Sequence, residues 1–208
     1  MNVAYPGPWP KLEEHDALLM DVARRIQLAK TKHEAAETNF RALCQHVDRE
    51  GSSLENRVVE CYPSGSFATG TAIASRVAKD QHDVDVVIEL DIPANSPPSQ
   101  ILGLLFEAIS GDAGSRYHGK VTQNTRCVTV EYGDGTTVDL MPIARIPGPE
   151  RAGNLFHFKK ETGESLLKAV NPWGFAKHFN DNVKFDPAFY DLFAGRRLLV
   201  EGRIVEKG

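Results

Sequence analysis

Residues 62–90, YPSGSFATGTAIASRVAKDQHDVDVVIEL, decide how this chain of 208 residues folds. The stretch places a Gly-Ser turn, Gly65-Ser66, and a short helix expected at 67–73 before a run in which Asp83 and Asp85 alternate with apolar residues. Side chains two residues apart on a β-strand leave the same face, so both carboxylates are expected on one side of a sheet. Carboxylate oxygens suit a divalent cation, and a glycine turn lets the backbone approach a phosphate. The stretch therefore predicts a strand that carries a metal and phosphate site.

The strand expected at 82–90 has two different faces. Its even-numbered positions from Val84 onward are apolar and predict the buried face, whereas Asp83 and Asp85 lead the other face. Glu89 shares the side of the aspartates, but it lies about 13 Å from Asp85 at about 3.3 Å per residue, too far to join the same ions. His82, next to the pair, is expected to be an exposed structural residue.

A β-hairpin is expected further along the chain. Residues 126–132 and 136–141 flank Gly133-Asp134-Gly135, which is a strong turn signal, and the second strand carries Asp139 near its far end. Residues 155–159 alternate like an edge strand. With Asp83 and Asp85, Asp139 would supply the third carboxylate that a two-metal site needs from adjacent strands. Alone, an Asp-x-Asp pair is more often a solvated strand end, and a Gly-Ser pair is usually only a turn.

The chain is expected to have three parts. Residues 1–50 form a helical spine, because apolar residues recur at helical spacing over 11–27 and again from Thr31 until Gly51. Residues 51–185 form the catalytic core, and residues 186–208 form a C-terminal helical segment. This arrangement predicts an α/β (α+β) fold with a mixed central sheet flanked by helices.

Composition excludes several classes of protein. The net charge is −4 with a pI near 6.0, so no extended duplex nucleic acid is expected as a partner. Cys44, Cys61 and Cys127 are widely spaced without a Cys-x-x-Cys pair, which argues against a structural zinc site or a disulfide framework and favours a reducing cytoplasm. Apolar runs long enough for a bilayer, or for the core of a signal peptide, do not occur in the sequence.

The motifs taken together resemble a known superfamily. Gly65-Ser66 and Gly70-Thr71, then Asp83-Val84-Asp85, then Val138-Asp139-Leu140-Met141-Pro142, are similar to the nucleotidyltransferases of the DNA polymerase β-like superfamily. More narrowly, the helical spine, the run PSGSFATGTAI with HDVDVVIEL, and NPWGFAKHFND resemble the bacterial cGAS/DncV-like nucleotidyltransferases. In the last motif, an Asn171-Pro172 pair begins a helix whose aromatic residues, Phe175 among them, are expected in the core.

The resemblance implies a role for each residue of the site. Gly65 and Ser66 would hold the terminal phosphates of an NTP substrate. Asp83 and Asp85 would ligate two Mg²⁺ or Mn²⁺ ions, and Asp139 would complete the metal that activates the acceptor hydroxyl. The implied activity is metal-dependent nucleotidyl transfer with release of pyrophosphate, making a cyclic di- or oligonucleotide second messenger in bacterial anti-phage defence.

One departure from the family leaves alternatives open. Those enzymes continue into a C-terminal helical lobe that closes the cleft, whereas this sequence stops at Gly208. The lobe would then come from a longer form or from a partner chain. One alternative is nucleotidyl transfer to a protein, a tRNA end or a small molecule. Another is a module that binds NTP without turnover.

Overall fold

The computed structural model describes residues 14–26, 28, 30–74 and 82–183. Residues 28–183 form one compact unit, and residues 1–27 belong with 184–208 to another, so the helix α1 (Glu14–Ile26) is described by itself. It confirms the helix expected at 11–27 over the residues described. The helical segment expected at 186–208 lies outside the described residues. Within the described residues, no helix is both long and apolar enough to span a bilayer.

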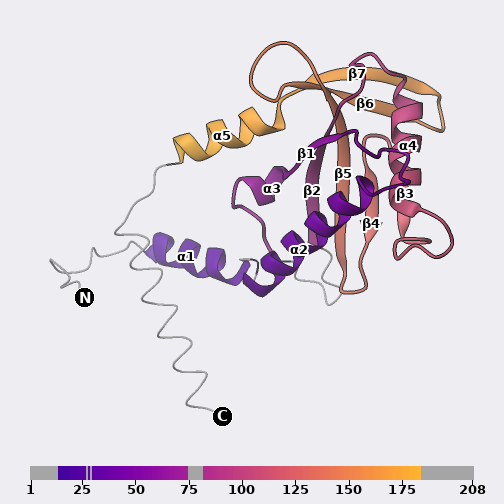
Figure 1. The fold of residues 1–208 in the computed structure, drawn as a ribbon. Coiled ribbons are helices and arrows are strands. Elements are labelled where there is room, and N and C mark those ends of the chain that lie inside the picture. The colour runs from indigo at the N-terminus through magenta and orange to yellow at the C-terminus, as the bar shows by residue number, and fades with distance from the viewer. Residues whose placement is uncertain (1–13, 27, 29, 75–81, 184–208) are drawn as a thin grey trace, which may run out of the picture. The chain divides into compact units, whose positions relative to one another are not determined.

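The described residues of the larger unit form a seven-stranded mixed sheet (Figure 1). Its strands are β1 (Val58–Pro63), β2 (His82–Leu90), β3 (Val121–Gln123), β4 (Val128–Glu131), β5 (Thr136–Arg145), β6 (Gly153–Lys159) and β7 (Glu164–Val170). The order is β1-β2-β5-β4-β3, and β6 joins the later part of β5 to β7. Only β2 and β5 are paired in parallel among these strands. The predicted mixed sheet and the predicted hairpin, β4 with β5, are confirmed.

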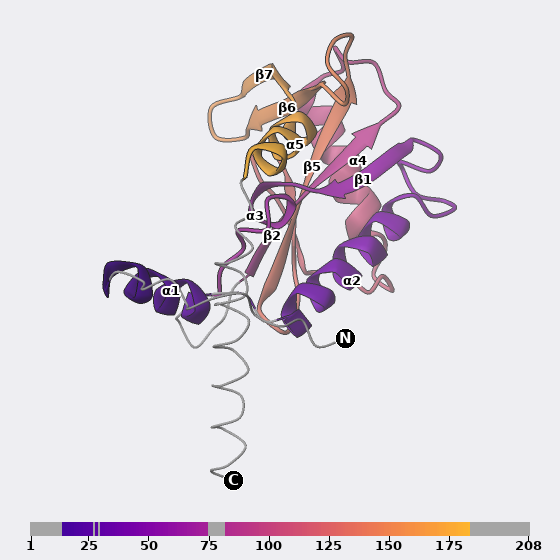
Figure 2. The same ribbon diagram turned by 90° about the vertical axis from the view of Figure 1, so that its left-hand side faces the viewer.

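Two helices, α2 (Lys30–Val47) and α4 (Pro98–Ser110), cover one face of this sheet, on the same side in Figure 2. Their apolar side chains pack against the even-numbered residues of β2 and β5. The side chains at the centre of this core are Phe40, Leu43, Val84, Val86, Ile88, Ile101, Leu105, Val138 and Leu140. The buried face expected for β2 is confirmed, because strict alternation on a strand sends every second side chain to the helices.

The opposite face of the sheet carries a smaller apolar cluster and all the predicted site aspartates. Val87 on β2 and Ile143 on β5 pack with Tyr62 and Leu155. The helix α5 (Pro172–Asn182) reaches this face through Trp173, whose ring meets that of Tyr62 edge-on at 5.7 Å. This face therefore carries a packed apolar cluster at one end of β2 and β5 and acidic side chains at the other.

The start of α5 is fixed by the Asn-Pro-Trp-Gly sequence. The Asn171 side chain accepts a hydrogen bond from the Gly174 N–H at 2.7 Å and donates one to the Glu150 carbonyl at 3.1 Å. A Cβ on Gly174 would lie 2.6 Å from the Asn171 amide nitrogen, so only glycine fits there. The helix expected at Asn171-Pro172 is confirmed. The expectation that its aromatic residues are buried is wrong for Phe175, which is 65% exposed because it points away from the sheet.

Two strand predictions need correction. β5 continues through Pro142 to Arg145, so Asp139 lies in its first half and not near its far end. β6 begins at Gly153 and is paired on both sides, so it is not an edge strand. Beyond β6 the edge strand is β7, whose residues are almost all exposed. A strand with two exposed faces has no alternation of apolar and polar residues, and for this reason the sequence pattern missed it.

Candidate active site

The three predicted aspartates lie on the paired strands β2 and β5. Asp85 stands directly opposite Asp139 in the parallel register, and Asp83 stands opposite Thr137. Neighbouring strands are about 4.8 Å apart, and all three side chains leave the face turned away from α2 and α4. The structure therefore brings together carboxylates that are separated by more than 50 residues in the sequence. Glu89, also on this face, is held further along by Arg145 at 2.6 Å, as its distance from the pair predicts.

Partial burial and mutual repulsion together set the electrostatics of this group. The pKa of Asp85 is raised, first because the surrounding strands remove part of its hydration and then because of the negative charges of Asp139 and Asp83. A divalent cation between these carboxylates would remove the repulsion, and an all-oxygen donor set is the one that Mg²⁺ and Mn²⁺ prefer. The donor chemistry of the group thus fits the metal that the sequence implies.

Two of the three carboxylates accept hydrogen bonds from neighbouring hydroxyl groups. Thr137 donates a hydrogen bond to Asp83, and Thr129 on β4 donates one to Asp139. As the side chains stand, no three or more His, Cys, Asp or Glu residues in the described part of the chain are grouped so that they could hold one metal ion. Sequence reasoning missed both threonines. The hairpin register could have identified Thr129, because a tight turn at Gly133-Asp134-Gly135 pairs it with Asp139.

The Gly-Ser turn is in direct contact with Asp85. The Ser64 N–H donates a hydrogen bond to the Asp85 carbonyl at 2.8 Å, and Gly65 has a positive φ of 56°. A Cβ on Gly65 would lie only 2.4 Å from Oδ2 of Asp85. The helix that follows is α3 (Gly65–Ala68), so it begins at the turn itself and is shorter than the helix expected at 67–73. The first N–H groups of a helix have no partner within it, and here they begin beside the acidic face.

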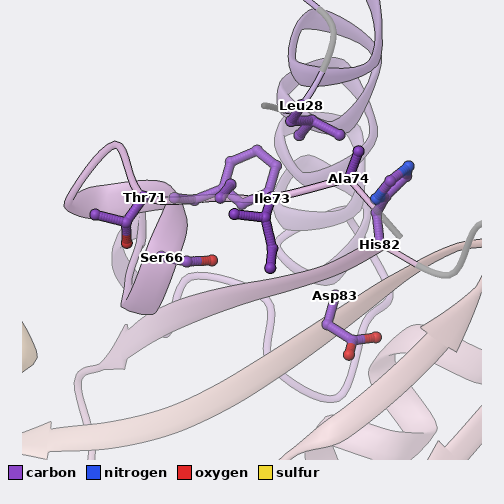
Figure 3. A pocket seen from close by; sticks show the side chains of 9 residues that line it. Leu28, Ser66, Thr71, Ile73, Ala74, His82 and Asp83 are labelled. Atoms are coloured by element: carbon purple, nitrogen blue, oxygen red, sulfur yellow. The ribbon is translucent and has the colours of Figure 1, made fainter. Parts of the chain in front are cut away.

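A cavity of about 280 Å³ lies next to this turn, at the start of β2 (Figure 3). Ser66 and Asp83 line it together with apolar side chains such as those of Leu28 and Ile73. His82 lines it as well, and its side chain leaves β2 in the direction opposite to that of Asp83 (Figure 3). The exposure expected for His82 is wrong, because it occupies an even-numbered position of β2 and is only 7% exposed. Its Nε2 lies 3.1 Å from Nζ of Lys32 on α2, a contact that the sequence could not indicate.

Known structures share this fold. The CD-NTase CdnG of Bradyrhizobium diazoefficiens, solved in complex with GTP, superposes with a TM-score of 0.74 at 30% identity, over 85% of this chain and 50% of that one. The 3'-deoxy ATP-bound form of Vibrio cholerae DncV gives a TM-score of 0.59 at 12% identity, over 77% and 57% of the two chains, and this likeness concerns the fold alone. The fold is thus that of the polymerase β-like nucleotidyltransferases, which confirms the prediction.

A narrower assignment follows from the sequence comparisons. Residues 14–154 match the model of the Second Messenger Oligonucleotide or Dinucleotide Synthetase domain, and the chain belongs to that family. A curated relative, the cyclic dinucleotide synthase CdnG of B. diazoefficiens, is 32% identical over 172 residues, which is 82% of this chain and 40% of the relative. The chain therefore spans about half the length, or less, of the relatives that it matches.

Proposed function

We propose that this chain is the nucleotide-binding half of a cyclic dinucleotide or oligonucleotide synthase. The observation that carries the proposal is the placement of Asp85 opposite Asp139 on two parallel strands, with Gly65 packed against the Asp85 carboxylate. Membership of the synthetase family and likeness to a GTP-bound synthase support NTPs as substrates. We further propose that the product acts as a second messenger in anti-phage defence.

The Gly-Ser turn and the paired strands β2 and β5 would contact different parts of the nucleotide. Gly65 brings the backbone close to the acidic face without a side chain in the way, and the Ser66 hydroxyl lines the adjoining cavity. Together with the first N–H groups of α3, that hydroxyl would donate hydrogen bonds to the terminal phosphates. Asp83, Asp85 and Asp139 would hold Mg²⁺ or Mn²⁺, and such ions supply charge neutralisation at the α-phosphate of the transferred nucleotidyl group and at the pyrophosphate that leaves.

The acidic residues also explain why nucleotide and cation should bind together. A triphosphate next to Asp83 and Asp85 would face carboxylates that already repel one another, as the raised pKa of Asp85 reflects. Nucleotide is therefore expected to bind only with a divalent cation. Turnover and cyclisation need the acceptor nucleotide to be held as well. In the curated relative more than half of the chain lies outside the part matched here, so a lobe from a longer form or from a partner chain would complete the cleft.

Binding and turnover can be tested separately. Binding of a fluorescent GTP or ATP analogue is expected with Mg²⁺ or Mn²⁺ and to be lost in EDTA. Asp85→Asn should abolish it, because the variant removes a charged carboxylate that would bind the cation on which nucleotide binding depends. Asp91→Asn is the matched control, since Asp91 is exposed just beyond the end of β2. Equal binding by the Asp85 variant, with a melting temperature like that of the wild type, would contradict the proposed site.

Incubation with α-labelled NTPs then identifies the reaction. A phosphatase-resistant product would support cyclisation, and label on added protein or tRNA would instead support transfer to another acceptor. Cation-dependent binding without pyrophosphate release would instead support an NTP-binding module without turnover. Each product should disappear in the variant with both Asp83→Ala and Asp85→Ala.

A further inference from the structure

Each of two site aspartates is matched with a threonine on the neighbouring strand. Thr129 on β4 stands opposite Asp139 in the antiparallel register, and its hydroxyl donates to Oδ1 of Asp139. Thr137 on β5 stands opposite Asp83 in the parallel register, and its hydroxyl donates to Oδ1 of Asp83. In both pairs the hydroxyl takes one carboxylate oxygen, Oδ1, and at Asp139 the Cys127 side chain is a further neighbour.

Thr129 is itself held by a third residue. The Asn124 side-chain amide donates a hydrogen bond to Oγ1 of Thr129 at 2.7 Å. A hydroxyl has a single proton, and because the amide takes an acceptor site on Oγ1, that proton is directed to the carboxylate. Asn124 is placed by a tight turn, in which its N–H donates to the Cys127 carbonyl at 2.9 Å. The chain of bonds therefore runs in one direction, from Asn124 through Thr129 to Asp139.

The pair formed by Thr137 and Asp83 is less constrained. The Thr137 hydroxyl also lies 3.4 Å from the His82 carbonyl, so its proton has two acceptors to choose between. Asp83 can thus lose this hydrogen bond while Thr137 keeps one, whereas the Asn124 amide holds Thr129 with its proton toward Asp139. Of the two carboxylates, Asp139 is the one whose orientation is determined from outside the acidic group.

We propose that Thr129 and Asn124 are positioning residues that hold the Asp139 carboxylate in the orientation in which it would bind the divalent cation. The inference rests on the proposed function, because it assigns a role toward the cation of that same site. Residues that orient metal ligands typically change the affinity for the metal 10- to 100-fold when they are replaced. Neither residue carries charge, so this effect would come through orientation and not through the electrostatics of the site.

Direct titration with Mn²⁺, followed by the loss of the free-ion EPR signal, tests this assignment without any turnover. Thr129→Val keeps the shape of the side chain and removes the hydroxyl, and we expect it to weaken Mn²⁺ binding about 10-fold. Thr129→Ser keeps the hydroxyl and should stay within about twofold of the wild type. Asn124→Ala should weaken binding by a smaller factor, since Thr129 then keeps its bond but loses its direction. This residue is exposed, so the variant provides a test even if Thr129→Val folds poorly.

The controls distinguish the proposed metal site from the positioning role of Thr129 and Asn124. Wild-type binding that Asp85→Asn removes would support the proposed metal site. If in addition Thr129→Val and Asn124→Ala bind Mn²⁺ as tightly as the wild type, the positioning role is refuted while the proposed function stands. If Thr129→Ser is as weak as Thr129→Val, the packing of the γ-methyl group and not the hydroxyl would be responsible, and the inference fails. If the wild type itself binds no Mn²⁺ that Asp85→Asn removes, the proposed function fails and the inference with it.

Discussion

The contact between Gly65 and Asp85 allows the coupling of the Gly-Ser turn to the acidic face to be tested by a single methyl group. In Gly65→Ala the new Cβ would lie 2.4 Å from Oδ2 of Asp85, whereas an ordinary contact begins near 3.4 Å, so the oxygen must withdraw by about 1 Å. The carboxylate ends a short side chain and can rotate away. The clash should therefore cost little stability and should instead change the orientation of a proposed metal ligand.

The free-energy cost of placing alanine at the positive φ of position 65 can be measured separately. At a φ of 56° an L-residue pays about 1–2 kcal/mol, and part of this is offset because alanine lowers the entropy of the unfolded chain. The net loss of about 1 kcal/mol corresponds to a melting temperature lower by about 2–4 °C for a protein of this size. Gly119→Ala is the matched control, because Gly119 has a φ of 75° and no atom within 4 Å of a built Cβ.

The two variants should therefore agree in stability and differ in binding. Ligand distances in metal sites are held within about 0.2 Å, so a shift of about 1 Å at Asp85 should weaken Mn²⁺ binding at least 10-fold in Gly65→Ala. Gly119→Ala should bind as the wild type does. The reasoning is refuted if Gly65→Ala also binds Mn²⁺ with wild-type affinity, or if its melting temperature falls much further than that of the control.

Other perturbations address the packing around the site. Asn171→Ala removes the cap of α5 and should lower the melting temperature by about 2–4 °C, for a cost of about 1 kcal/mol; an unchanged value would show that the cap adds no stability. Arg145→Ala leaves the fully buried Glu89 without this partner and should cost about 1–3 kcal/mol in urea unfolding, because the Arg145 side chain is 49% exposed and water can reach that side of the pair, whereas replacing both residues with leucine should cost less; equal losses would contradict this. Burial, then the charge of Arg49, lowers the pKa of His46 below its usual 6.5, so the unfolded state binds more protons and stability should fall as the pH drops below about 6.5. In His46→Gln this slope should flatten in denaturation curves, and an identical slope would exclude His46 as its source.

The sequence by itself determined the features that depend on neighbours along the chain. Alternation from Val84 onward identifies the buried face of β2, because the period of a strand is two residues whatever lies beside it. Gly65 marks the turn before β2, since glycine readily adopts the positive φ found there. The Asn171-Pro172 pair marks the start of α5, where a side chain and a ring satisfy the first turn.

Only the tertiary structure decided which of these features meet. Asp85 faces Asp139 because β2 and β5 are adjacent and parallel, and a shift of the register by one residue would place Asp139 next to an apolar position. His82 is buried because α2 lies over it, although the sequence around it is polar. The hydroxyl of Thr137 became part of the site in the same way, because β5 lies beside β2. Strand order and register depend on contacts between segments far apart in the chain, and no local periodicity encodes them.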